Sequence, residues 1–197
     1  HVWAARAVAE LENMRNVRVM SRTTVTGAYD QGTFGALERV NQHRGGGGDG
    51  APLACFWRIV AKNSILAAGA IERPVAFQNN DRPGIMTAGA VRAYLNRWGV
   101  SPGRAVTVFA NNDDAHRTAQ DMTAAGVRVA AVIDSRAEVR STAEYPVYRN
   151  AQVSNSQGGK ELESISILVN GKTEKIQTDC LAMSGGWNPS VHLTCHM

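Results

Sequence analysis

The stretch SILAAGAIERP, residues 64–74, decides how the rest of the chain is interpreted. It begins with an apolar segment over residues 64–68, which predicts a short strand that ends at a glycine. Small residues leave the main chain bare at this strand end, so a packed helix or a flat ligand such as a dinucleotide can approach closely. The small residues are Ala67, Ala68, Gly69 and Ala70.

A second motif, CLAMSGGWNP at residues 180–189, repeats this design with an apolar strand, glycines and a proline-containing exit. Close packing of a helix on a strand would explain the glycines of either motif taken singly. Because the two motifs flank a strand–helix–strand unit, together they predict a dinucleotide-binding type of fold.

The unit between the motifs has the pattern of a βαβ module. Residues 105–110, AVTVFA, form a continuous apolar run of the kind that is buried in a parallel sheet. A helix is expected over residues 115–125, and a second apolar strand over residues 127–133 ends at Asp134. Such a crossover is expected to be right-handed.

Periodicity and turn residues predict the remaining elements. We expect helices over residues 2–14 and 87–98, strands over 17–20 and 23–29, hairpin arms over 33–41 and 55–62, and a hairpin of 164–169 with 173–178 around Asn170-Gly171. The tip of the long hairpin, residues 44–50, contains four consecutive glycines and is expected to be mobile.

The predicted fold class is therefore α/β, with a Rossmann-like βαβ module inserted into part of a second FAD/NAD(P)-binding-type domain. The expected domains are a partial outer domain over residues 1–80, an inserted NAD-binding-like module over 81–178 and a return to the outer domain over 179–197. The N-terminal glycine-rich motif of the outer domain is missing from residues 1–80, and the chain is interpreted as a piece of a longer polypeptide.

The turn that would hold a pyrophosphate in the inserted module contains no glycine. It reads ANNDDA over residues 110–115, and Asp113 and Asp114 place two carboxylates where phosphate charges would arrive. These acids suit the positive end of a helix instead. Asp134 stands where a ribose-binding acid is expected. The module is thus either a nucleotide site or a structural βαβ unit.

Composition narrows the function classes. The net charge is +4 without a basic run, which argues against nucleic acid, and no apolar run approaches the ~20 residues that cross a bilayer. Charged residues make up 19%, below the usual value of roughly 25%, as expected for a surface that other protein covers. Without a leader segment, the expected location is cytoplasmic.

Catalytic and metal-binding patterns are not evident in the sequence. Three cysteines lack metal-ligand spacing and are expected to be reduced thiols, and the absence of C-x-x-C argues against a disulfide reductase. His43, His116 and His192 are isolated, so each is expected to be a surface or helix histidine. We therefore expect no catalytic set and no metal site.

One long run, ILAAGAIERPVAFQNNDRPGIMTAGAVRAYLNRWGV, resembles the alpha subunit of heterotetrameric sarcosine oxidase. GTFGALERV upstream and VFANNDDAHRTAQDMTAAGV downstream support the resemblance, which extends from about Trp3 to Pro189. Relatives with an alpha-type subunit include opine and hydroxyproline dehydrogenases and hydrogen cyanide synthase.

The resemblance implies an oxidoreductase that demethylates sarcosine to glycine, with formaldehyde captured on tetrahydrofolate and oxygen reduced to hydrogen peroxide. It implies NAD in the full alpha subunit, FAD and FMN in the assembled complex, and beta, gamma and delta subunits as partners. We expect the fragment alone to be inactive and to bind none of these cofactors tightly.

The resemblance also implies cofactor-binding residues at three places. Thr24, Val25 and Thr26 match a strand whose main chain usually faces the adenine, although an ordinary core strand remains possible. Ala67, Ala68 and Gly69 match the turn beside the adenosine. Gly185, Gly186 and Asn188 match the final turn near the nicotinamide or flavin ring.

The contact partners of two arginines and the choice between two functional hypotheses stay open at this point. Arg73 and Arg82 are expected to meet phosphate or a partner subunit, or to pair with Glu72 and Asp81. The chain is either the part of an alpha subunit that holds NAD and docks other subunits, or a non-catalytic docking module of a related amine, opine or hydroxyproline dehydrogenase complex.

Overall fold

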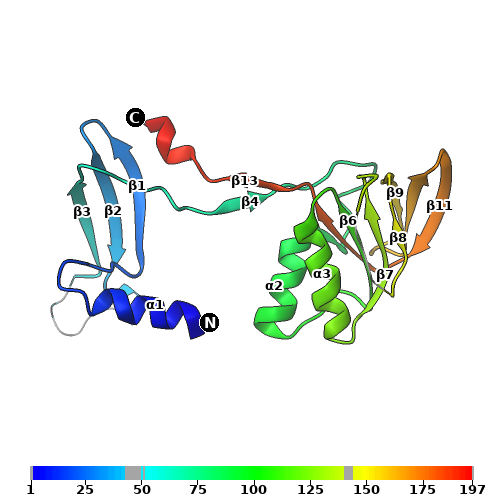
Figure 1. The fold of residues 1–197 in the computed structure, drawn as a ribbon, viewed down its shortest axis with the longest axis horizontal. Coiled ribbons are helices and arrows are strands. Elements are labelled where there is room, and N and C mark those ends of the chain that lie inside the picture. The colour runs from blue at the N-terminus through cyan, green and yellow to red at the C-terminus, as the bar shows by residue number, and fades with distance from the viewer. Residues whose placement is uncertain (1, 43–49, 51, 140–143, 197) are drawn as a thin grey trace. The chain divides into compact units, whose positions relative to one another are not determined.

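The computed structural model describes residues 2–42, 50, 52–139 and 144–196, and its contacts divide the chain into two units. Unit 1 consists of His1–Ala68 and Ser190–Met197, and unit 2 of Gly69–Pro189 (Figure 1). The boundaries expected from the sequence lie near residues 80 and 179. Unit 2 of the structure is therefore about ten residues longer at each end than the expected inserted module. The difference arises because residues 180–184 join the sheet of the βαβ module, and because residues 70–72 pair with residues 187–189 in a separate two-stranded ribbon of the same unit.

Unit 2 is built on a five-stranded sheet in which every neighbouring pair is parallel. Its order along the sheet is β5 (Ile85–Thr87), β12 (Cys180–Ser184), β6 (Ala105–Ala110), β7 (Arg128–Asp134) and β8 (Val147–Tyr148). The expected βαβ module consists of β6, the helix α3 (Asp113–Ala124) and β7. The strand β12, which the chain reaches last, lies between β5 and β6.

The sheet is the middle of three layers. The helices α2 (Ala88–Trp98) and α3 (Asp113–Ala124) cover one face (Figure 1). An antiparallel sheet of β9 (Ala151–Gln157), β10 (Ser164–Val169) and β11 (Lys172–Gln177) covers the other. The predicted β10–β11 hairpin is confirmed, with positive φ at both Asn170 and Gly171, as a type I′ turn requires.

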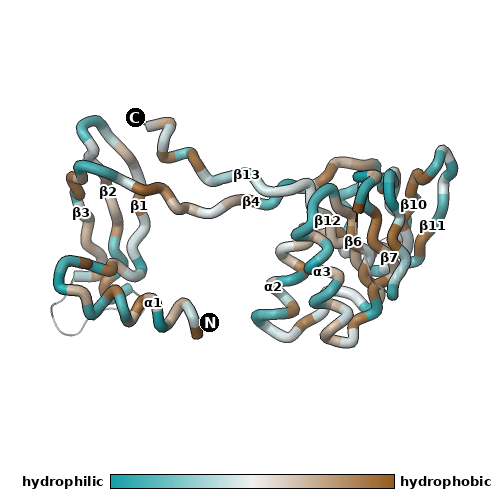
Figure 2. The backbone as a smooth tube through the Cα atoms, viewed as in Figure 1, coloured by the Kyte–Doolittle hydropathy of each residue, from teal (hydrophilic) through white to brown (hydrophobic). Residues whose placement is uncertain are grey.

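Alternation along the strands separates the two cores. In β6, Val106 and Val108 pack with the helices, whereas Phe109 packs with the antiparallel sheet. In β12, Ala182 belongs to the helix side and Leu181 to the opposite side. Figure 2 shows these strands as hydrophobic segments within unit 2. Burial on both faces explains the continuous apolar runs in the sequence.

Two glycines admit the strand β12 to the middle of the sheet. A Cβ on Gly103 would lie 2.5 Å from the Cβ of Cys180, and a Cβ on Gly84 would lie 2.7 Å from the carbonyl oxygen of Asp179. Gly84 also has φ +101°, a conformation that other residues rarely adopt. The Asp179 carboxylate then accepts the main-chain N–H groups of Arg104 and Ala105 at 3.0 and 2.8 Å.

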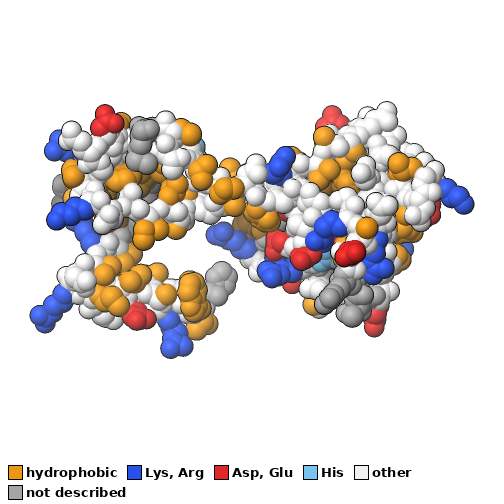
Figure 3. All heavy atoms as spheres, turned by 45° about the horizontal axis from the view of Figure 1, so that its top comes forward, with side chains coloured by type: hydrophobic (Ala, Val, Ile, Leu, Met, Phe, Trp, Pro, Cys, Tyr) orange, Lys and Arg blue, Asp and Glu red, His pale blue; other side chains and the backbone are white. Residues whose placement is uncertain are grey.

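Unit 1 combines α1 (Val2–Glu12), an antiparallel sheet of β1 (Thr23–Tyr29), β2 (Thr33–Arg39) and β3 (Ala54–Val60), and the short 3₁₀ helix η2 (His192–His196). No residue of α1 is buried, and Trp3 is 82% exposed. Figure 3 shows hydrophobic side chains at the surface of this unit. Unit 1 therefore leaves a large part of its apolar surface uncovered.

Several expected elements differ from the structure. Residues 17–20 and 64–68 form no strand, because no strand in the described part of the chain pairs with them. The first motif instead forms β4 (Ala70–Glu72), which pairs with β13 (Trp187–Pro189). The short strands β5 and β8 and the polar strand β9 were not expected. Most of the glycine-rich tip lies outside the described residues. Among those residues, no helix is long and apolar enough to cross a membrane.

A polar clamp joins the two helices of unit 2. The Asp121 carboxylate of α3 accepts hydrogen bonds from Nε of Arg92 at 2.7 Å and from the side-chain amide of Asn96 at 2.8 Å, both on α2. Arg92 also reaches Asp114 at 3.5 Å. Burial tends to raise the pKa of Asp121, but the bonds from Asn96 and Arg92 outweigh it, so the pKa lies below its usual value.

The core of unit 2 should be sensitive to the loss of side-chain volume. Met122 of α3 is fully buried, so Met122→Ala is expected to reduce the free energy of unfolding of unit 2 by about 2–5 kcal/mol. Hydrogen exchange of the slowest amides in β6 and β12 measures this. Met14→Ala, at a methionine that is 39% exposed in unit 1, is the matched control. Equal exchange in both variants would contradict the layered core.

The clamp should make stability depend on pH in the acid range. A lowered folded-state pKa means that Asp121 stabilises unit 2 above its unfolded-state pKa of about 3.9 and loses this contribution as the pH falls through the folded-state value. Asp121→Asn should therefore cost about 0.5–1 kcal/mol at pH 7, and the difference from wild type should shrink below pH 4. Urea unfolding at several pH values tests this, with Glu174→Gln on the exposed strand β11 as control. A pH-independent difference would rule the clamp out.

Candidate cofactor site

The carboxyl ends of β12, β6 and β7 meet at one edge of the parallel sheet, which is where open α/β sheets usually hold nucleotides. Ser184 ends β12, Ala110 ends β6 and Asp134 ends β7. The helix α3 starts at this edge, directly after the turn that joins it to β6. These elements would form the usual dinucleotide crevice of unit 2.

Side-chain amides fill the turn between β6 and α3. The Asn112 oxygen caps α3 by accepting the N–H of Ala115 at 3.2 Å. The Asn112 amide nitrogen donates to the carbonyl and hydroxyl oxygens of Ser184 at 3.2 and 3.0 Å, and Asn111 donates to the carbonyl of Gly185 at 3.3 Å. The Ala115 N–H and the side-chain amides of this turn are therefore bonded within the chain.

Asp134, the expected ribose-binding acid, has no exposed surface and is fully engaged. Arg136 donates to it from its main-chain N–H, from Nε and from Nη2 at 2.9–3.0 Å, and Nε2 of His116 lies 2.7 Å from its second oxygen. Burial tends to raise the pKa of Asp134, but hydrogen bonds from Arg136 and His116 outweigh it and lower the pKa. Arg136 also pairs with Asp113 at 2.7 Å, which links β7 to the first turn of α3.

The two glycine motifs meet in unit 2 as a ribbon of two strands. Asn188 of β13 lies opposite Ile71 of β4, and the ladder continues with Gly185 N–H to Arg73 O at 2.7 Å and Arg73 N–H to Gly186 O at 2.8 Å. A Cβ on Gly185 would lie 3.0 Å from the Arg73 carbonyl oxygen. This close approach of two main chains accounts for the glycine at position 185 without a ligand.

The remaining predicted residues are exposed. Ala67 and Ala68 belong to the end of the first segment of unit 1, and Gly69 begins unit 2. Gly69 has φ +74°, and nothing lies within 4 Å of the position that its Cβ would take. The structure therefore places open space beside Gly69, and the strand expected before it is absent.

The predicted adenine strand, Thr24 to Thr26, lies in β1 of unit 1. β1 is the outer strand of its sheet, and all three residues are exposed. The register shifts between Val25 and Gly27, and the Thr26 hydroxyl donates to the carbonyl of Gly35 at 3.2 Å. One main-chain edge of β1 thus remains without a partner strand in this sheet, a geometry that can contact the edge of a flat base.

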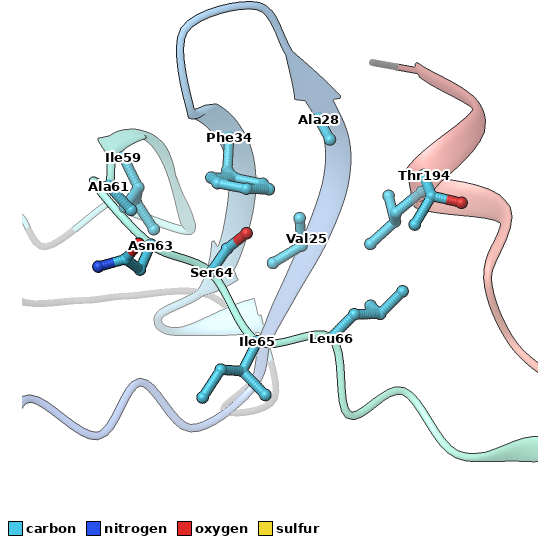
Figure 4. Close-up of a pocket in the computed structure, with 11 residues that line it drawn as sticks. Val25, Ala28, Phe34, Ile59, Ala61, Asn63, Ser64, Ile65, Leu66 and Thr194 are labelled. Carbon is cyan, nitrogen blue, oxygen red and sulfur yellow. The ribbon is translucent and has the colours of Figure 1, made fainter.

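An apolar cavity of about 300 Å³ opens beside this strand within unit 1 (Figure 4). Val25 and Ala28 of β1, Phe34 of β2 and Ile59 of β3 line it, together with the segment around Leu66 and the helix η2. The cavity thus brings the predicted residue Val25 close to the segment that leads to Ala67. Its volume is at the lower end of the range for ligand pockets.

Sequence reasoning missed the polar cluster at the sheet edge. His116 was expected to be isolated, but its side chain is only 12% exposed and contacts Asp134. The available signal was topological, because the end of β7 and the first turn of α3 must meet at one edge in a βαβ unit. Arg82 forms no ion pair with Asp81; it donates to the Ser156 hydroxyl and to the main-chain carbonyls of Gly158 and Gly159. Glu72 accepts the Gly89 N–H at the start of α2.

Neither a metal centre nor a reactive thiol is evident in the described part of the chain. No group of three or more potential ligands is close enough there to hold a metal ion. The cysteines Cys55, Cys180 and Cys195 form no disulfide with one another in the structure. Burial, together with the negative charge of Asp179, raises the pKa of Cys180 to about 12, so this thiol stays protonated at neutral pH.

Comparison with solved structures places the fold. The chain superimposes on L-proline dehydrogenase from P. horikoshii with a TM-score of 0.63 and 22% identity, covering 97% of this chain and 33% of that one. Bacillithiol disulfide reductase from Bacillus cereus gives a TM-score of 0.62 and 15% identity, covering 100% and 59%. The predicted fold class, α/β with a Rossmann-like βαβ module, is confirmed.

Comparison with curated sequences gives the family, although no protein-family model matches the chain. The sarcosine oxidase alpha subunit of Rhizobium meliloti (strain 1021) is 48% identical over 189 residues, which cover 95% of this chain and 19% of that protein. The alpha subunit from Corynebacterium sp. (strain P-1) is 38% identical, covering 97% and 21%. An opine oxidase subunit of Agrobacterium tumefaciens (strain Ach5) is 30% identical, covering 68% and 25%. The chain therefore belongs to the sarcosine oxidase alpha-subunit family and corresponds to about one fifth of the length of those subunits.

Proposed function

We propose that this chain is part of the alpha subunit of a sarcosine oxidase-type complex and contributes NAD binding and subunit docking. The complex would convert sarcosine, oxygen and water to glycine, formaldehyde and hydrogen peroxide, with the formaldehyde passed to tetrahydrofolate. Its place would be the cytoplasm. The identity of 48% along nearly the whole chain to a subunit with that activity in its name is the observation that carries the proposal.

The exposed strand β1 supports a role in holding NAD. Its outer edge has no partner strand in this sheet, the main-chain groups of Val25 face that edge, and the cavity next to Val25 provides apolar surface. An adenine ring has complementary hydrogen-bonding groups along one edge and apolar faces. The FAD and FMN of the assembled complex would supply the oxidation chemistry, on parts of the assembly other than the residues described.

The surface of unit 1 supports a role in docking. α1 buries none of its residues, and Val2 and Trp3 are 76% and 82% exposed. Large exposed aromatic and aliphatic side chains favour contact with further protein, because contiguous apolar surface is costly in water. Beta, gamma and delta subunits, or further parts of the same polypeptide, would cover this surface.

A second candidate is a structural module that binds no cofactor. A similar segment occurs in an opine oxidase subunit, a protein whose name gives a substrate other than sarcosine. The engaged side chains at the carboxyl edge of unit 2 favour this alternative for that unit. In this case the chain would only position neighbouring subunits of an amine, opine or hydroxyproline dehydrogenase complex.

Calorimetric titration of NAD into the chain distinguishes the two candidates. Micromolar affinity supports cofactor binding, and millimolar or absent binding supports the structural module. Val25→Glu should weaken any binding at β1 at least about tenfold, because it places a charge against the adenine position. Leu168→Glu, at a strand residue of unit 2 with similar exposure (45% against 41%), should leave the affinity unchanged. Equal losses in both variants would exclude β1 as the binding strand.

The isolated chain should not oxidise sarcosine. None of the described residues forms a catalytic set, and the flavins are proposed to lie elsewhere in the assembly, so a peroxide assay with sarcosine and oxygen should give only the background rate. The complete complex of a related sarcosine oxidase is the positive control. Robust sarcosine-dependent peroxide production by the chain alone would contradict the division of labour proposed here.

A further inference from the structure

We infer that the dinucleotide crevice of unit 2 is closed by its own side chains, so that this unit binds no NAD and acts as a rigid support. The side chains that close it are Asn112, His116, Asp134 and Arg136, here called the edge cluster. Each of them fills a position that a dinucleotide would need.

The first position is the pyrophosphate cradle. In a functional module of this type, glycines let the pyrophosphate approach free N–H groups at the helix N-terminus. In unit 2, the N–H of Ala115 is already bonded to Asn112, and the Asn112 amide is bonded to Ser184. A pyrophosphate that used the Ala115 N–H would have to break its bond to Asn112, and it would lie against the acids Asp113 and Asp114.

The second position is the ribose acid. A ribose hydroxyl needs a carboxylate oxygen that is free to accept a hydrogen bond. Both oxygens of Asp134 already accept from Arg136, and one of them also contacts His116 at 2.7 Å, in a place with no exposed surface. Displacing Arg136 would leave a buried carboxylate without its compensating charge, which is strongly unfavourable.

The third position is the space between strand and helix. The Arg136–Asp113 ion pair at 2.7 Å joins the end of β7 to the first turn of α3, so a ligand that entered between these two elements would have to displace it. The cavity of about 230 Å³ near this edge is a separate space, because Phe109 and the β9 residues Gln152 and Val153 line it on the opposite side of the sheet from α3.

The closure concerns unit 2 alone and does not depend on the proposed function. If the proposed NAD binding is correct, the closure implies that the NAD lies on unit 1. Proton–nitrogen correlation NMR spectra of the chain, titrated with NAD to several millimolar, test both statements residue by residue.

The expected result is that the amides of residues 111–116, 135 and 136 do not shift. Shifts at Thr24, Val25 and Thr26 without shifts at the edge cluster would support both the closure and the proposed NAD binding. No shifts anywhere would support the closure and count against NAD binding by the chain. Saturable shifts at the amides of Asn112, Ala115 or Arg136 would overturn the closure.

Two variants separate closure by the cluster from simple charge repulsion. Asp114→Asn removes one negative charge beside the turn but leaves Asn112, Asp134 and the Arg136–Asp113 pair engaged, so these amides should still not respond to NAD. A saturable response in this variant would overturn the inference. In the wild-type chain, the Ala115 amide should be protected from hydrogen exchange, and Asn112→Ala should reduce that protection at least about tenfold. Absence of protection in wild type would show that the cluster is open in solution.

Discussion

The structure of unit 2 depends on the pairing of β12 with two strands that come much earlier in the chain. Leu181 pairs with Ile85 on one side and with Thr107 on the other, so five residues close the gap between β5 and β6. Without β12, the sheet would split and both hydrophobic cores would open along a line of unpaired main chain. The cost of such unpaired groups makes this strand a condition for the helix layer and the antiparallel layer alike.

The anchoring of β12 also fixes the edge where the candidate site lies. Asp179 holds the start of β6 through two main-chain N–H groups, and five residues later Ser184 receives the Asn112 amide at the opposite end of the strand. The register of β12 against β6 therefore sets the position of α3 relative to the sheet edge. A buried acid at the end of β7 is tolerable in this frame because Arg136 and His116 are held within hydrogen-bonding distance of it.

Much of this arrangement could be predicted from the sequence, and the parts that could not have physical reasons. The β6–α3–β7 unit was predictable because doubly buried strands read as continuous apolar runs. β9 was missed because several of its residues are polar: the Ser154 hydroxyl bonds to Ser166 on the next strand, and the Ser156 hydroxyl bonds to Asn79, which lies far away in the sequence. β5 and β8 are too short to show a period. The prediction of a strand at residues 64–68 was wrong, because an apolar composition does not by itself provide a neighbouring strand to pair with.

The predicted cofactor residues show what a cluster of small residues in the sequence can and cannot predict. Bare main chain at a strand end indicates that something approaches closely, but it does not identify what approaches. At Gly185 the approaching group is the Arg73 carbonyl, so a second strand of the same chain uses the space. At Gly69 nothing approaches in unit 2. Side chains with hydrogen-bonding capacity decide the matter, because a site is available to a ligand only when its polar groups are not already bonded. At the carboxyl edge of unit 2, the polar side-chain groups of Asn112 and Asp134 are bonded within the chain. The outer edge of β1, in contrast, has no partner strand in its sheet.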